Sequence, residues 1–133
     1  CGRHGCAEAL ASVPKLIESY NSKSTDIKVT DVRKLHELFS KGDALAKDIL
    51  EREARYLALL LADLANIVNP SRIFIGGEIT PVLPDILEQI RKNFSVQVLP
   101  TNTCDIKISK LDQVSIAHGA AIMAMEKEIE SYF

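Results

Sequence analysis

The sequence is poor in cysteine, in aromatic residues and in uninterrupted apolar runs, and each shortage excludes a class of protein. Three cysteines in 133 residues are unlike the dense, even disulfide frameworks of secreted mini-domains. No basic cluster or aromatic stripe marks a nucleic-acid surface. The longest apolar run, LALLLADLANIV, is interrupted by Asp63 and Asn66 and is shorter than the ~20 residues of a membrane span. We therefore expect a cytoplasmic location, no membrane segment and no nucleic-acid binding by this stretch itself.

The composition is that of an ordinary globular domain. Hydrophobic residues make up 47%, charged residues 26%, and the formal charge is −2. The first residue is Cys1 and not methionine. We therefore expect residues 1–133 to form one partial domain of a longer protein.

Apolar periodicity and capping residues predict a helix-rich chain with few strands. Pro14 predicts a kink or break in the first helix, and the polar residues 21–26 predict a loop. Thr30 and Asp43 are the expected N-caps of the second and third helices. The expected elements are helices over 5–20, 31–42, 44–69, 81–94 and 115–133, and strands over 73–75 and 105–111.

Burial is also predicted by the pattern. The strand over 73–75 is apolar throughout and the second half of the 44–69 helix is apolar almost all round, so both should be buried on several sides. The small residues His118-Gly119-Ala120-Ala121 predict close packing against another backbone. Two strands cannot form a self-sufficient α/β sheet, so the sheet must take strands from residues outside this chain. Uncovered apolar helix faces then favour a homo-oligomer, such as a dimer.

The first candidate site is the stretch CGRHGCAE. Cys1 and Cys6 are separated by a glycine-containing turn, which is a usual way to supply two of the four ligands of a zinc site. A reduced structural pair, a disulfide and a catalytic nucleophile remain open on spacing alone, although no general base is identifiable for the last. Glu8 follows in the first turn of a helix, where it either compensates the helix dipole or binds a polyhydroxylated ligand.

The second candidate site is the turn Gly76-Gly77. A strand that ends in two glycines before a helix lets a ligand approach the backbone at the carboxyl end of the sheet. Close chain packing explains the same pair equally well, and neither a P-loop nor a GxGxxG motif is present. His36 and Cys104 are expected to be structural.

Taken together, three segments resemble the ROK family of bacterial repressors, open reading frames and sugar kinases. CGRHGCAE resembles the family signature CxCGxxGCxE. IVNPSRIFIGGEI resembles the family segment that ends in two glycines, and AHGAAIMAM resembles the terminal helix of the family. The resemblance implies an α/β, helix-rich fold, namely part of the C-terminal lobe of a ribonuclease-H-like, actin-like ATPase. It implies zinc bound by Cys1, Cys6, a further cysteine and a histidine upstream of residue 1, and it implies that Glu8 binds sugar hydroxyls.

The resemblance leaves a regulator and a kinase as alternatives. Sugar kinases of the family usually carry a third glycine where this chain has Glu78, and a carboxylate there would repel the phosphates of ATP. We therefore favour a sugar-responsive regulator whose DNA-binding domain lies outside this chain. The alternative is an ATP-dependent sugar kinase, in which Gly76 and Gly77 contact the nucleotide. A third reading is a dimerisation module that binds no ligand.

Overall fold

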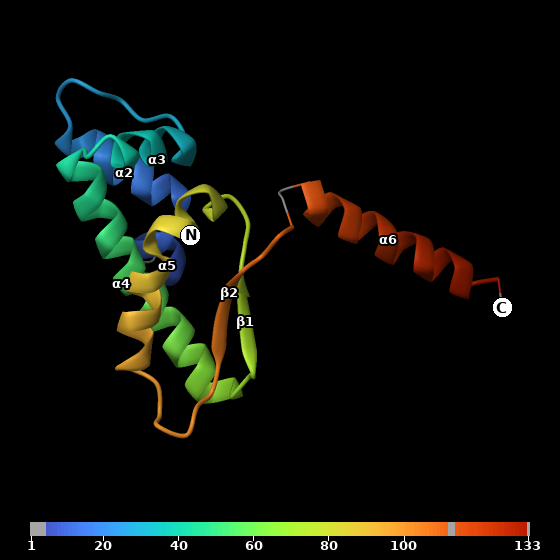
Figure 1. The fold of residues 1–133 in the computed structure, drawn as a ribbon. Helices are drawn as coiled ribbons and strands as arrows, with labels where there is room; N and C mark the ends of the chain where they lie inside the picture. Colours follow the sequence, from blue (N-terminus) through green and yellow to red (C-terminus); the bar gives the residue numbers. More distant parts are fainter. Residues whose placement is uncertain (1–4, 112–113, 133) are drawn as a thin grey trace.

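The computed structural model describes residues 5–111 and 114–132, and their order of elements agrees with the sequence pattern (Figure 1). No helix within these residues is both long and apolar enough to cross a bilayer. The helices and strands are α1 (Ala7–Ala11), α2 (Val13–Lys23), α3 (Val32–Ser40), α4 (Ala44–Val68), β1 (Arg72–Ile75), a 3-10 turn η1 (Thr80–Val82), α5 (Leu83–Ser95), β2 (Asp105–Ile108) and α6 (Val114–Glu130).

Local signals at helix starts explain most of these boundaries. Pro14 breaks the first helical segment in two, and Ser12 caps α2 by accepting a hydrogen bond from Lys15 N–H. Asp43 caps α4 as expected, since its Oδ1 accepts from Ala46 N–H at 2.7 Å. Asn69 ends α4 in the left-handed region, with φ 48°.

Two boundary predictions are wrong. The cap of α3 is Asp31 and not Thr30, because the Asp31 carboxylate accepts from Lys34 N–H at 2.9 Å, which lowers its pKa. The loop predicted over 21–26 begins later, since α2 continues to Lys23. The Asn21 side chain donates a hydrogen bond to the Val29 carbonyl and accepts one from the Val29 N–H. A side chain of α2 thus fixes the loop between α2 and α3.

The core lies where α4 packs against α5, with α2 and α3 covering the first half of α4. The strands β1 and β2 form a parallel pair in the register Ile73–Ile106 and Ile75–Ile108. These isoleucines face the helices, whereas Phe74 on the other face of the pair is 60% exposed. Among the fully buried core side chains are Leu35, Ile49, Leu50, Leu83 and Ile90.

Three burial expectations are not met within the described residues. β1 is buried only at Ile75, because nothing covers its outer face. The second half of α4 is buried toward α5 but leaves Leu59 and Leu64 close to half exposed. α6 extends away from the other elements in Figure 1, its side chains from Ala117 onward are exposed, and no atom lies within 4 Å of a Cβ built on Gly119.

Candidate functional site

Cys6 and Glu8 lie at the start of α1, a single short helix that packs against α4 and α2. Gly5 precedes them with φ +82°, a conformation that favours glycine. Cys6 is the N-cap residue, but its thiol is exposed and makes no capping bond; its carbonyl instead accepts from Ala9 and Leu10. Glu8 is exposed in the first turn. Both side chains are thus available to a ligand.

Cys1, the other predicted zinc ligand, lies outside the described residues. Within residues 5–111 and 114–132, no three side chains of His, Cys, Asp or Glu gather as a metal site. Cys6 therefore offers one thiolate of the kind that zinc prefers, and the remaining ligands would have to come from Cys1 and from elsewhere.

A small cavity of about 130 Å³ lies beside this turn, between α1 and the second half of α4. Gly5 and Ala7, which flank Cys6 and precede Glu8, form part of its wall. Most of the remaining lining is apolar, with Asp63 at one side. The cavity thus lies where α1, the helix that follows the cysteine turn, contacts α4. The lining residues are Gly5, Ala7, Leu10, Ala11, Tyr56, Leu59, Leu60 and Asp63.

The two glycines at the end of β1 have different reasons to be glycine. A Cβ built on Gly76 would lie 2.9 Å from Ser109 Cβ, so the close approach of the two strand ends requires a residue without a side chain. Gly77 has φ +92° and open space beside it. Gly76 is therefore explained by chain packing, and only Gly77 keeps the open side that an approaching ligand needs.

The turn after Gly77 is held by Thr80, whose N–H and hydroxyl both donate to the Gly77 carbonyl, at 3.1 and 2.6 Å. Glu78 projects from this turn and is exposed. A carboxylate thus stands beside the one glycine that is open to a ligand. This turn lies at the end of the β pair, whereas Glu8 is on α1, so the two candidate sites are on different elements.

One group that the sequence did not single out for chemistry, the carboxyl of Glu53, is unusual in the structure. Glu53 on α4 is 1% exposed and its Oε1 has no hydrogen-bond partner among the described residues. Burial raises its pKa to about 7, although Arg52 acts in the opposite direction. The i, i+3 and i+4 spacing of Glu53 from Leu50, Ile49 and Leu57 on the apolar stripe was the available signal.

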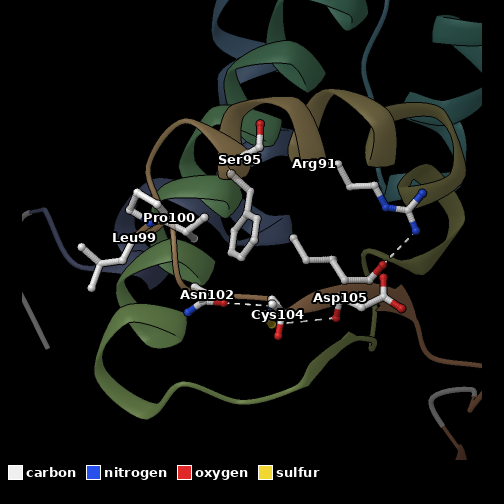
Figure 2. A pocket seen from close by; sticks show the side chains of 11 residues that line it. Arg91, Ser95, Leu99, Pro100, Asn102, Cys104 and Asp105 are labelled. Atoms are coloured by element: carbon white, nitrogen blue, oxygen red, sulfur yellow. Dashed lines mark hydrogen bonds between the residues drawn. The ribbon is translucent and has the colours of Figure 1, made fainter.

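A second cavity, of about 580 Å³, is remote from both predicted sites and lies at the start of β2 (Figure 2). It contains Cys104, whose pKa is raised by burial and by Asp105. A raised pKa keeps a thiol protonated, which fits the structural role expected for this cysteine. His36 is structural too, since its Nδ1 lies 2.8 Å from Asp85 Oδ2 and joins α3 to the first turn of α5 when protonated.

The described residues have a helix-rich α/β fold of the actin-like ATPase class, which a solved ROK regulator and a solved ROK hexokinase share. A solved ROK family transcriptional regulator, a homologue of E. coli Mlc, superposes with a TM-score of 0.70 at 24% identity, over 84% of this chain and 31% of that one. The ROK family profile matches residues 1–127. This chain belongs to the ROK family.

Relatives of both functional classes are similar to this chain. The DNA-binding transcriptional repressor Mlc of Escherichia coli is 30% identical, over 92% of this chain and 32% of the relative. N-acetylmannosamine kinase of Haemophilus influenzae is 34% identical, over 91% of this chain and 39% of the relative. The chain thus spans less than half the length of these relatives, and similarity alone does not separate a repressor from a kinase.

Proposed function

We propose that this chain is the C-terminal part of a sugar-responsive ROK transcriptional regulator. In this proposal it contributes to sugar binding and to dimerisation in the cytoplasm. DNA is bound by an N-terminal domain that is not part of this chain. Similarity to the repressor Mlc supports the proposal, and the exposed apolar helix faces support the dimer.

Glu8 is the proposed sugar contact. Its carboxylate is exposed, and the short helix that carries it is fixed by contacts with α4 and α2. A carboxylate accepts hydrogen bonds from several hydroxyl groups, and charged acceptors form stronger bonds than neutral ones. Glu8 would accordingly orient a sugar through its hydroxyls.

Zinc is the proposed structural cofactor of the intact protein. The exposed thiol of Cys6 has no hydrogen bond within residues 5–111 and 114–132 that a metal would have to displace, so this residue fits a ligand role. Cys1 would supply a second thiolate, and a histidine and a cysteine upstream would complete the set. Bound zinc would tie these segments together and so fix the turn that precedes Glu8.

One observation favours the regulator over the kinase. Glu78 is exposed in the turn directly after Gly77, the glycine with open space beside it. A polyphosphate approaching this backbone would meet a fixed negative charge.

The alternative function is an ATP-dependent sugar kinase, which similarity to N-acetylmannosamine kinase supports. In a kinase, Gly76 and Gly77 would line the nucleotide site. A dimerisation module without a ligand is the third candidate.

Calorimetry on the full-length gene product tests the sugar site. Glucose and N-acetylmannosamine are titrated into the wild type, the Glu8→Ala variant and the Glu18→Ala variant. Glu18 is a matched control because it is an exposed acid on the neighbouring helix α2, where it pairs with Lys15. We expect Glu8→Ala to weaken sugar binding about tenfold or more, as for loss of a charged hydrogen bond. Equal binding by Glu8→Ala and wild type would make Glu8 a helix-start acid only.

A further inference from the structure

β2 has one edge bonded to β1 and one open edge. The N–H groups of Asp105 and Ser109 donate to Ser71 and Ile75 of the β1 segment, at 3.1 and 2.7 Å. Backbone groups of alternate residues in a strand point to opposite neighbours. The N–H and C=O groups of Ile106 and Ile108 therefore face away from β1, along the open edge.

Side chains cap only part of this edge. Arg91 donates from Nη2 to the Ile106 carbonyl at 2.9 Å, and Asn102 Oδ1 accepts from Cys104 N–H at 2.9 Å (Figure 2). Among the described residues, no group bonds to the N–H of Ile106 or to either backbone group of Ile108. An edge with unpaired main-chain groups is a template for a further strand.

The 580 Å³ groove lies beside this edge. The end of α5 forms one wall and the loop over 99–104 forms another (Figure 2). Its apolar residues are Phe94, Val98, Leu99, Pro100 and Ile106, and Leu99 is 57% exposed. The groove can therefore receive apolar side chains from a segment that lies along β2.

Most of the polar side chains that line the groove are already bonded within the described residues. The Arg91 guanidinium donates hydrogen bonds to the Glu88 carboxylate, at 2.7 Å, and to the Ile106 carbonyl. The Asn102 side chain accepts a hydrogen bond from the Cys104 N–H and donates one to the Ala65 carbonyl. Small-molecule sites rely on a few converging polar groups that are free to bind the ligand. Unpaired N–H and C=O groups beside a partly apolar groove instead suit an extended peptide, which binds by adding a strand.

Arg91 also defines the charge of the peptide. The N–H of an incoming strand would replace the guanidinium at the Ile106 carbonyl. With Nη1 still bonded to Glu88, the released Nη2 and the adjacent Nε could then bind a carboxylate through two parallel hydrogen bonds. We propose that the open edge of β2 and the groove beside it bind an extended peptide segment of a partner protein, one in which a carboxylate side chain is flanked by apolar residues.

Nuclear magnetic resonance with a defined peptide tests this proposal. The ¹⁵N-labelled chain is titrated with a capped pentapeptide, Val-Glu-Val-Glu-Val. We expect shifts at the amides of Cys104, Ile106 and Ile108 and at Arg91 Nε–H. Two control peptides, one with lysine in place of glutamate and one N-methylated at alternate amides, should bind about tenfold more weakly or not at all.

Protein variants separate the role of Arg91 from a general charge effect. Arg91→Glu should weaken binding of the acidic peptide about tenfold. Lys92→Glu makes the same charge change at the next, exposed position of α5 and should leave binding unchanged. If Arg91→Glu does not fold, the N-methylated peptide on the wild type still decides the question. The proposal is overturned if no shift appears along β2, if the N-methylated peptide binds as well as its parent, or if the shifts lie at Arg72 and Phe74 on the other edge.

Discussion

At the scale of single residues, the structure divides the candidate site residues by what explains them. Gly76 is explained by the approach of Ser109, and Gly77 by its positive φ. Cys6 and Glu8 have exposed side chains that no contact within the described residues requires. The residues with least structural explanation are thus the ones for which we propose a ligand.

Replacing Gly76 tests the packing explanation. We expect Gly76→Ala to lower the free energy of unfolding by about 1–3 kcal/mol, because the new Cβ would clash with the end of β2. Gly119→Ala is the matched control, since nothing lies within 4 Å of its added Cβ. Urea unfolding of both variants provides the measurement. A Gly76→Ala chain as stable as wild type would show that Ser109 moves aside freely.

Glu53 makes stability depend on pH. Its pKa is raised from 4.5 to about 7 in the folded chain, so the folded state keeps a proton that the unfolded state has lost. The contribution of protonated Glu53 to the free energy of unfolding is fully present below pH 4.5 and is lost as the pH rises toward 7. The loss amounts to roughly 3 kcal/mol at most. Unfolding free energies at pH 5 and pH 8 should therefore differ less in Glu53→Gln than in wild type.

The control for this prediction is Glu51→Gln, on the same helix, where the side chain is exposed. It should keep the pH dependence of the wild type. If Glu53→Gln and wild type lose stability equally between pH 5 and pH 8, Glu53 is ionised in the folded chain. The prediction that burial keeps it protonated is then wrong.

At the scale of elements, predictions from local sequence signals were more reliable than predictions of burial. Asp43 and Pro14 act on their own helix turns, so their effects could be predicted from neighbouring residues. Thr30 and Asp31 are both capping types, and only the backbone geometry selects Asp31. Burial of β1 and α6 depends on what covers them from elsewhere, which no pattern within one element specifies. The burial of Glu53 could be predicted from its place on the apolar stripe of α4, but the lack of a described hydrogen-bond partner for its Oε1 could not, because that depends on the neighbouring helices.

The exposed face of α6 predicts self-association of the isolated chain. Ile122, Met125 and Ile129 follow one another at helical spacing and are each more than half exposed. Replacing all three by serine should weaken association at least about tenfold, as measured by sedimentation equilibrium. Serines at Ala120, Ala124 and Lys127, on the opposite face, should change it little. Equal association in both triple variants would assign the contact to another surface.

At the scale of the whole molecule, the chain belongs to the ROK family and spans less than half the length of the relatives it matches. The fold class was predictable from three short segments, because each combines unusual residues at fixed spacing. The choice between regulator and kinase was not predictable, because relatives of both classes are similar to this chain, and our proposal of a regulator depends on the single residue Glu78.

The most direct test of this account measures ATP turnover by the full-length gene product. Purified protein is incubated with ATP, magnesium and either glucose or N-acetylmannosamine, and ADP release is followed while sugar binding is confirmed by calorimetry. The account predicts that sugar binds without ADP release. Sugar-dependent ADP release would contradict it and would assign this chain to a kinase.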